Sequence, residues 1–130
     1  MSSTKDTSTF ELKSSLQLSD FVEILLEPLN KYQHLYLIRL GLHEALVNAV
    51  KHGNKFDSSK IIKVKRIITP HWWVWIIMDQ GQGMVHEKRK FTLPKRTDSV
   101  SGRGLFIISE CFDDVRWSPK GNKLQLALKR

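Results

Sequence analysis

The sequence predicts an α+β protein, a two-layer α/β sandwich in which three helices cover one face of a mixed β-sheet. One observation is the order of the expected elements, strand-helix-helix-strand-strand-helix-strand-strand, which supplies adjacent strand pairs and three helices. Another is composition: 41% of the 130 residues are hydrophobic, enough for one substantial core in a domain of ordinary size. No internal repeat or composition break divides the chain.

The N-terminal segment, residues 1–9, is rich in Ser and Thr, and we expect it to be a disordered tail. A single domain is expected over residues 10–130. It opens with a strand, predicted by mostly alternating positions: Phe10, Leu12, Ser14 and Leu16.

A short first helix is expected from Asp20 to about Glu27. Ser19 is its predicted N-cap, because a serine hydroxyl can accept a hydrogen bond from a free backbone N–H of the first turn. Pro28 ends or bends this helix, since proline lacks the backbone donor that a helix requires.

The second helix has the clearest boundary signals. Asn30 is a good N-cap, and Gln33 at the third helical position completes a capping box. Gly53 is a natural C′ residue. Between these ends apolar side chains recur at helical spacing: Leu35, Ile38, Leu42, Ala45, Leu46 and Ala49.

Four strands and one helix are expected in the rest of the chain. Residues 72–79 are apolar on both faces, which predicts a central strand. In the strand before it, Ile62, Val64 and Ile68 share one face. The other expected elements are strands over residues 60–69, 114–118 and 123–129 and a helix over residues 104–111.

Charge and cysteine content narrow the function classes. Twenty-one Lys and Arg against 13 Asp and Glu give a net charge of +8, which favours acidic partners such as nucleotide phosphates, nucleic acid or an acidic protein. A single cysteine, Cys111, excludes an internal disulfide and a cysteine-based zinc site. The longest apolar run, residues 72–78, is too short to span a bilayer, and the first ten residues lack a signal-peptide core. We therefore expect a soluble cytoplasmic protein with no membrane partner.

Glu44 and Asn48 lie four positions apart on the second helix, so both side chains point to one face. Glu44 has the chemistry of a general base, although a lone helix carboxylate is more often simply solvated. Asn48 can ligate Mg²⁺ through its amide oxygen, or serve as an exposed or capping amide. His52, near the helix end, can contact phosphate or complement the helix dipole.

Asp79 stands where the apolar strand ends, and its carboxylate can accept a hydrogen bond from an amino group such as that of adenine. Gly81 and Gly83 then let the backbone approach a flat ring closely. A tight turn is the alternative explanation, although a turn needs only one glycine.

Gly102-Arg103-Gly104 precedes the apolar third helix. Glycines before a helix N-terminus expose backbone N–H groups that bind anions. Arg103 can add a charged contact to phosphate, or face solvent from a flexible loop. The preceding loop carries cations that suit either a lid over phosphates or a solvated segment: Lys88, Arg89, Lys90, Lys95 and Arg96.

Three motifs, taken in order, resemble the ATP-binding boxes of the GHKL (histidine kinase-like) ATPase superfamily. Over about residues 10–129, the chain is most similar to the small bacterial anti-sigma factor serine/threonine kinases. The matched boxes are Glu44-x-x-x-Asn48 with His52-Gly53-Asn54 (N-box), Asp79-x-Gly81-x-Gly83-Met84 (G1 box) and Gly102-x-Gly104-Leu105 (G2 box).

The resemblance implies the Bergerat ATP-binding fold and a role for each matched position. Glu44 would deprotonate a Ser or Thr hydroxyl on a partner protein, Asn48 would ligate Mg²⁺ at the phosphates, and Asp79 would bind the adenine amino group. The other positions would complete the ATP pocket: His52, Gly81, Gly83, Met84, Gly102, Arg103, Gly104 and Leu105.

The implied function is phosphorylation of an anti-anti-sigma (STAS) protein in a bacterial partner-switching pathway that regulates transcription, with a sigma factor as the inhibited target. The resemblance implies ATP and Mg²⁺ as cofactors and leaves a homodimer open. A second hypothesis is a non-catalytic ATP-binding switch. A third is a basic domain whose tryptophan-bearing strands stack nucleobases. The motifs do not favour direct nucleic-acid binding.

Overall fold

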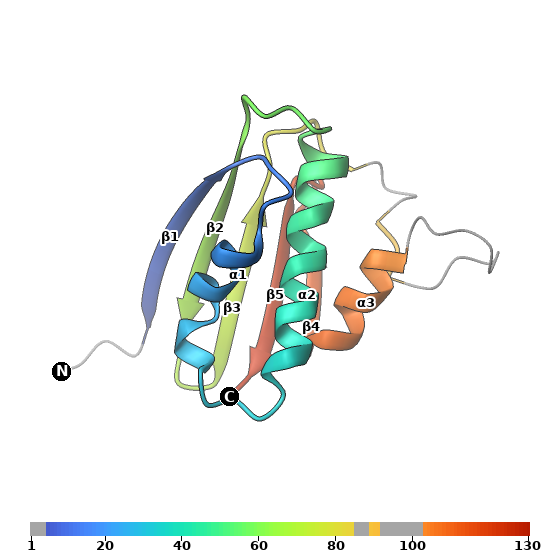
Figure 1. Cartoon of the computed structure of the whole chain (residues 1–130). Coiled ribbons are helices and arrows are strands. Elements are labelled where there is room, and N and C mark those ends of the chain that lie inside the picture. The colour runs from blue at the N-terminus through green and yellow to red at the C-terminus, as the bar shows by residue number, and fades with distance from the viewer. Residues whose placement is uncertain (1–4, 85–88, 92–102) are drawn as a thin grey trace.

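The computed structural model describes residues 5–84, 89–91 and 103–130. In these residues five strands form one sheet in the order β1-β2-β3-β5-β4, and three α-helices lie on one of its faces (Figure 1). The elements are β1 (Asp6–Lys13), α1 (Ser19–Leu25), α2 (Leu35–Asn48), β2 (Ile61–Ile68), β3 (Trp72–Met78), α3 (Arg103–Cys111), β4 (Asp114–Trp117) and β5 (Lys123–Lys129).

The predicted α+β sandwich and its order of elements are confirmed. One detail differs, because all four strand pairings are antiparallel and the sheet is not mixed. The reason is the placement of β5. The strands β3 and β4, which α3 connects, run in the same direction, but β5 lies between them and pairs antiparallel with both. The parallel unit is therefore split, and no parallel pair is hydrogen-bonded among the described strands.

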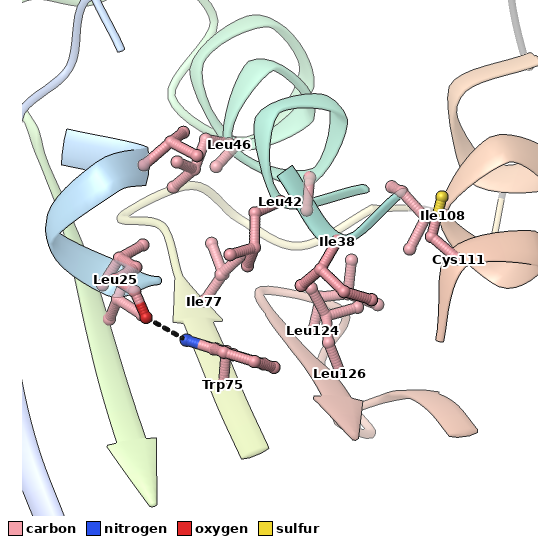
Figure 2. Packing of buried hydrophobic residues seen from close by; sticks show 14 of the residues in the cluster. Leu25, Ile38, Leu42, Leu46, Trp75, Ile77, Ile108, Cys111, Leu124 and Leu126 are labelled. Carbon is pink, nitrogen blue, oxygen red and sulfur yellow. Dashed lines mark hydrogen bonds between the residues drawn. The ribbon is translucent and has the colours of Figure 1, made fainter. Parts of the chain in front are cut away.

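The core lies between the helices and the covered face of the sheet, with β3 at the centre as predicted (Figure 2). Trp75 is fully buried there, and its Nε1 donates a hydrogen bond of 3.1 Å to the carbonyl of Leu25 at the end of α1. Burying a side chain such as Leu42 or Leu126 stabilises the fold by roughly 1.5–3 kcal/mol. The central strand therefore serves as the platform on which α1 and α2 are held.

Arg66 occupies a core-facing position of β2 between Val64 and Ile68. Ile62 and Val64 lie on the same face, as predicted, and are buried. The Arg66 guanidinium lies 4.9 Å from the centre of the Phe10 ring and donates to the Ile24 carbonyl at 3.0 Å. The carbonyls at the C-terminal end of a helix attract a cation, so Arg66 anchors the end of α1 to the sheet.

The N-terminal boundaries differ from the prediction. The strand β1 already begins at Asp6, so residues 6–9 are not part of a disordered tail; they pair with β2 from Ile68 to Lys65. The helix α1 begins at Ser19, with the buried Leu18 in the N-cap position and no side-chain cap. The burial of Leu18 in the core, and not a serine cap, sets this boundary.

The predicted capping box of the second helix is also wrong. Residues Glu27–Leu29 form a 3₁₀ turn, and the N–H of Asn30 closes it by donating to the Glu27 carbonyl. Two more turns follow before α2 begins at Leu35, with His34 as the N-cap residue. Pro28 and the burial of Leu29 favour the short turn over an early helix start.

The helices α2 and α3 approach each other closely at Gly41. A Cβ atom on Gly41 would lie 2.6 Å from a ring carbon of Phe112 and 2.8 Å from the Cβ of Cys111. Both distances are too short for carbon atoms, so the helices pack at a separation that only glycine permits.

Replacing Gly41 with Ala is therefore expected to lower the free energy of unfolding by about 1–3 kcal/mol, because the two helices must move apart. In a helix without such a contact the same change would raise stability by about 1 kcal/mol. Urea denaturation of the two proteins measures the difference, and a more stable variant would contradict the close packing.

Candidate functional site

A small cavity lies where the C-terminal half of α2 meets the ends of β3 and β5. Three segments far apart in the sequence form its walls, and its volume is about 10 Å³, room for about one water molecule. The lining residues are Ala45, Asn48, Ala49, Gly53, Ile77, Asp79, Met84, Trp117, Gly121 and Leu124.

Glu44, Asn48 and Gly104 converge beside this cavity. A Cβ atom placed on Gly104 would lie 3.2 Å from Glu44 Oε2 and 3.5 Å from Asn48 Oδ1. The structure thus confirms that the two helix side chains share a face, and it brings them to the first turn of α3, which begins at Arg103. An acid, an amide and a helix N-terminus meet at one point.

The amide nitrogen of Asn48 is buried and has no hydrogen-bond partner among the residues that the structure describes. Leaving a buried amide group unpaired costs about 1–3 kcal/mol, and such groups are rare unless a ligand completes them. The oxygen and nitrogen of an amide are assigned from the surrounding contacts, so either atom can be the one that faces a ligand. The Asn48 side chain is therefore suited to bind a ligand in the cavity.

Asp79 follows directly after β3 and lines the same cavity. Its Oδ1 accepts a hydrogen bond of 2.8 Å from the N–H of Gly81. A Cβ atom on Gly53 would overlap the Asp79 carboxylate, and one on Gly81 would overlap the Gly53 carbonyl. Burial raises the pKa of the Asp79 carboxyl above its ordinary value, and the Gly81 N–H and the charges of Lys60 and Lys120 partly offset that rise.

Gly53 is therefore required for a reason that differs from the predicted one. It was expected to end the helix as a left-handed C′ residue, but its φ is not positive; the non-glycine residues with positive φ are Lys55 and Phe56. The helix ends instead in a π turn over Ala49–Gly53. Gly53 is needed because the Asp79 carboxylate occupies the space of its side chain.

The turn between β4 and β5 holds the second half of the glycine motif, which is Asp79-x-Gly81-x-Gly83-Met84. Gly83 has a φ of +96°, and a Cβ atom there would overlap the Lys120 carbonyl. The N–H of Met84 donates to the Gly121 carbonyl at 3.0 Å, and the N–H of Asp79 donates to the Asn122 carbonyl at 3.0 Å. These contacts hold the segment from Asp79 to Met84 against the turn.

Arg89 does not extend toward the cavity as a phosphate-binding lid cation. Its guanidinium donates to three carbonyls, those of Met84 at 2.6 Å, Pro119 at 3.0 Å and Lys120 at 3.1 Å. Its own carbonyl accepts a hydrogen bond from Trp117 Nε1. Arg89 thereby ties the end of the glycine motif to the β4–β5 turn, a role that the sequence pattern did not indicate.

The remaining predicted residues are placed as follows. Gly102, Lys88, Lys95 and Arg96 lie outside the described residues. Arg103 is exposed at the first position of α3, whereas the Leu105 side chain is buried in the core, which leaves only its backbone for a ligand. His52 is exposed in the π turn and does not line the cavity.

The tryptophans have packing roles. Trp75 lies in the core, Trp73 contacts Tyr32 edge-on, and Trp117 stacks on Phe91. Trp72 lies beneath the ammonium of Lys129, 5.9 Å from the ring centre. In the part of the chain that the structure describes, no helix is long and apolar enough to cross a membrane.

One buried residue, which the sequence indicated only as the last position of the N-box, connects the walls of the site. Asn54 is fully buried at the end of the π turn. Its side chain donates to the Ile61 carbonyl at 3.0 Å and accepts from the Gln80 N–H at 2.8 Å. A polar residue after a helix is an ordinary turn signal, so sequence alone could not distinguish this role.

Comparison with known proteins agrees with this geometry. Residues 23–128 match the family described as histidine kinase-like ATPase domain. The chain is also similar to a serine-protein kinase, RsbW, of Bacillus licheniformis, with 27% identity over 92 residues, which cover 65% of this chain and 58% of that protein. The chain therefore spans somewhat more than half the length of this relative.

Replacing Asp79 with Asn should stabilise the nucleotide-free protein at neutral pH. Because burial raises the pKa of Asp79, the unfolded chain releases this proton at a lower pH than the folded chain does. The free energy of unfolding therefore falls as the pH rises from the unfolded toward the folded pKa. An asparagine avoids this loss and keeps an acceptor for the Gly81 N–H.

Urea denaturation between pH 3 and 8 measures this effect, and the gain should disappear near the ordinary aspartate pKa of about 3.9. Asp57→Asn is the matched control of opposite sign, because hydrogen bonds from Ser59 lower the pKa of Asp57. A loss of stability in Asp79→Asn at pH 7 would contradict the raised pKa of the Asp79 carboxyl.

Proposed function

This chain belongs to the histidine kinase-like ATPase domain family, and we propose that it binds Mg-ATP and transfers the γ-phosphoryl group to a Ser or Thr hydroxyl of a partner protein. The observation that carries the proposal is the meeting of Glu44, Asn48 and Gly104 at the start of α3. A reaction of this kind depends mainly on positioning and on neutralising charge. These residues position the reacting groups, and Mg²⁺ held at Asn48 together with the N-terminus of α3 would neutralise charge.

Asp79 provides the adenine contact in this proposal. One carboxylate oxygen already accepts the Gly81 N–H, which holds the group in one orientation. A carboxylate accepts two or more hydrogen bonds, so it can also receive the adenine amino group. Gly53 and Gly81 leave no side chain between this carboxylate and the cavity.

Asn48 provides the protein ligand for Mg²⁺. Its side chain lines the cavity, and its amide nitrogen is buried without a partner among the described residues. Rotating the amide by half a turn would put its oxygen, the atom that can bind a metal, in that place. Mg²⁺ prefers oxygen donors and is usually held by one or two side chains together with phosphates and water. When bound, the ion would neutralise charge on the phosphates. The N-terminus of α3, with Arg103 and Gly104, offers backbone N–H groups for the same phosphates.

Glu44 is the general base. It lies one helical turn before Asn48, and both side chains are adjacent to Gly104. A carboxylate at that place can remove the proton of an incoming hydroxyl as it attacks the γ-phosphorus. Gly83, Met84 and Leu105 complete the proposed pocket, Leu105 through its backbone, whereas the exposed His52 is left out of it.

The partner is proposed from the relative named as a serine-protein kinase. We infer that the substrate is an anti-anti-sigma (STAS) protein and that a sigma factor is the inhibited target, in the cytoplasm of a bacterium. The net charge of +8 suits an acidic partner surface as well as the phosphates. A homodimer is compatible with this role and is tested by measuring the molar mass in solution.

Replacing Glu44 with Gln is expected to lower phosphoryl transfer by about 10²–10⁴-fold, because a general base contributes that much to proton transfer. Transfer is measured with γ-labelled ATP and the STAS protein of the same organism. Glu110→Gln, an exposed carboxylate on α3, is the control and should keep full activity. Equal transfer by Glu44→Gln and the wild type would remove Glu44 as the general base, and ATP binding without transfer by the wild type would favour a non-catalytic switch.

Replacing Asn48 with Ala should make nucleotide binding less dependent on Mg²⁺. Calorimetric titration with ATP, in Mg²⁺ and in a chelator, gives the ratio of the two dissociation constants. The wild-type ratio should be large and that of Asn48→Ala close to one, since the variant lacks the protein ligand. An equal ratio in both proteins would remove Asn48 from the metal site, and no ATP binding by the wild type would contradict the whole proposal.

A further inference from the structure

The ladder between β2 and β3 ends one step before the nucleotide site. Its last pair is Lys63 with Met78, so a regular continuation would align Ile62 with Asp79 and Ile61 with Gln80. That continuation does not occur. The chain instead leaves β2 at Asp79 while its N–H still pairs with Asn122 on the other side.

The side chain of Asn54 occupies the position of the missing pair. Its Oδ1 accepts from the Gln80 N–H at 2.8 Å, and its Nδ2 donates to the Ile61 carbonyl at 3.0 Å. The Ile61 N–H donates to the Gln80 side-chain oxygen at 2.8 Å. Three of the four backbone groups that a regular pair would have joined, the Ile61 N–H, the Ile61 carbonyl and the Gln80 N–H, are therefore satisfied by a side chain. The Asn54 carboxamide stands in for a peptide group between the strands.

This insertion has a direct consequence for Asp79. With the amide of Asn54 between Ile61 and Gln80, the segment after β3 cannot close against β2, and the Asp79 carboxylate comes to rest over Gly53 and faces the cavity. Asn54 is fully buried, and its backbone N–H donates to the Ala49 carbonyl at 2.8 Å. Hydrogen bonds therefore hold both the backbone and the side chain of this residue.

We propose that Asn54 is a positioning residue that sets the adenine specificity of this chain by holding the Asp79 carboxylate at the base-binding end of the cavity. The inference rests on the proposed function, because it assumes that Asp79 receives the adenine amino group. It goes further in assigning base selectivity to a residue that does not touch the nucleotide.

The test compares ATP with purine riboside triphosphate, which carries hydrogen in place of the 6-amino group. A hydrogen bond between that amino group and a carboxylate makes ATP bind about tenfold or more tightly. In Asn54→Ala the preference should fall to within about threefold, because Asp79 is no longer held, while binding of the analogue changes little. A general loss of structure would weaken both nucleotides alike and leave their ratio unchanged.

Two comparisons separate positioning from stability. Thr69→Val removes an acceptor of the Trp72 N–H at the opposite end of the same two strands, and it should keep the ATP preference. Asn54→Ala added to Asp79→Asn should cause no further change in preference, since both act through one carboxylate. Asn54→Ser, which leaves room for a bridging water, serves if the alanine variant does not fold.

An Asn54 variant that retains the wild-type preference overturns the inference and leaves the proposed function intact. A wild type that binds ATP but shows no preference over the analogue overturns the inference together with the adenine role of Asp79. A wild type that does not bind ATP overturns the proposed function and, with it, this inference. Amide exchange in the wild type adds a check without mutation, because a rapidly exchanging Gln80 N–H would contradict its bond to Asn54.

Discussion

The close approach of the Asp79 carboxylate to Gly53 is the constraint on which the arrangement of this site depends. It brings the end of β3 against the end of α2, and this is possible only because residue 53 has no side chain. The π turn over Ala49–Gly53 adds a residue to the last turn and directs the following Asn54 into the interior. The end of α2 and the end of β3 therefore constrain each other, and the cavity lies between them.

The same constraint has an energetic cost. A carboxylate held in this position loses hydration, which raises the pKa of Asp79, and only one backbone N–H and the charges of Lys60 and Lys120 offset the loss. The unpaired amide of Asn48 adds a second cost at the opposite wall. Both groups line the cavity, which is where perturbed groups are expected in a functional site. They are not the only costly groups among the described residues, because Ser14 Oγ and Arg66 Nε are also buried without a partner.

Local pattern was sufficient to predict the regular elements and insufficient to predict their ends. The limits of β5 agree with the prediction, and β3 is central as expected, because alternation and apolar runs are properties of the strands themselves. The caps at Ser19 and Asn30 failed because the burial of Leu18 and Leu29 decides where α1 and α2 begin. In the site, the spacing of Glu44 and Asn48 places both on one helix face. The role of Asn54 depends on the register of β2 and β3, which no local pattern contains.

Contacts between segments far apart in the sequence explain why the site contains several glycines. A turn after β3 would need one glycine, and Gly83, with its positive φ, satisfies that need. Gly81 has no such conformation; it is required because the Gly53 carbonyl lies where its side chain would be. Gly104 directly borders the side chains of Glu44 and Asn48 beside the cavity. Gly81 and Gly83 mark places where one segment of backbone passes close to another, and Gly104 marks the contact of α3 with two side chains of α2. The spacing of the glycines therefore follows from contacts around the pocket and not from the turns alone.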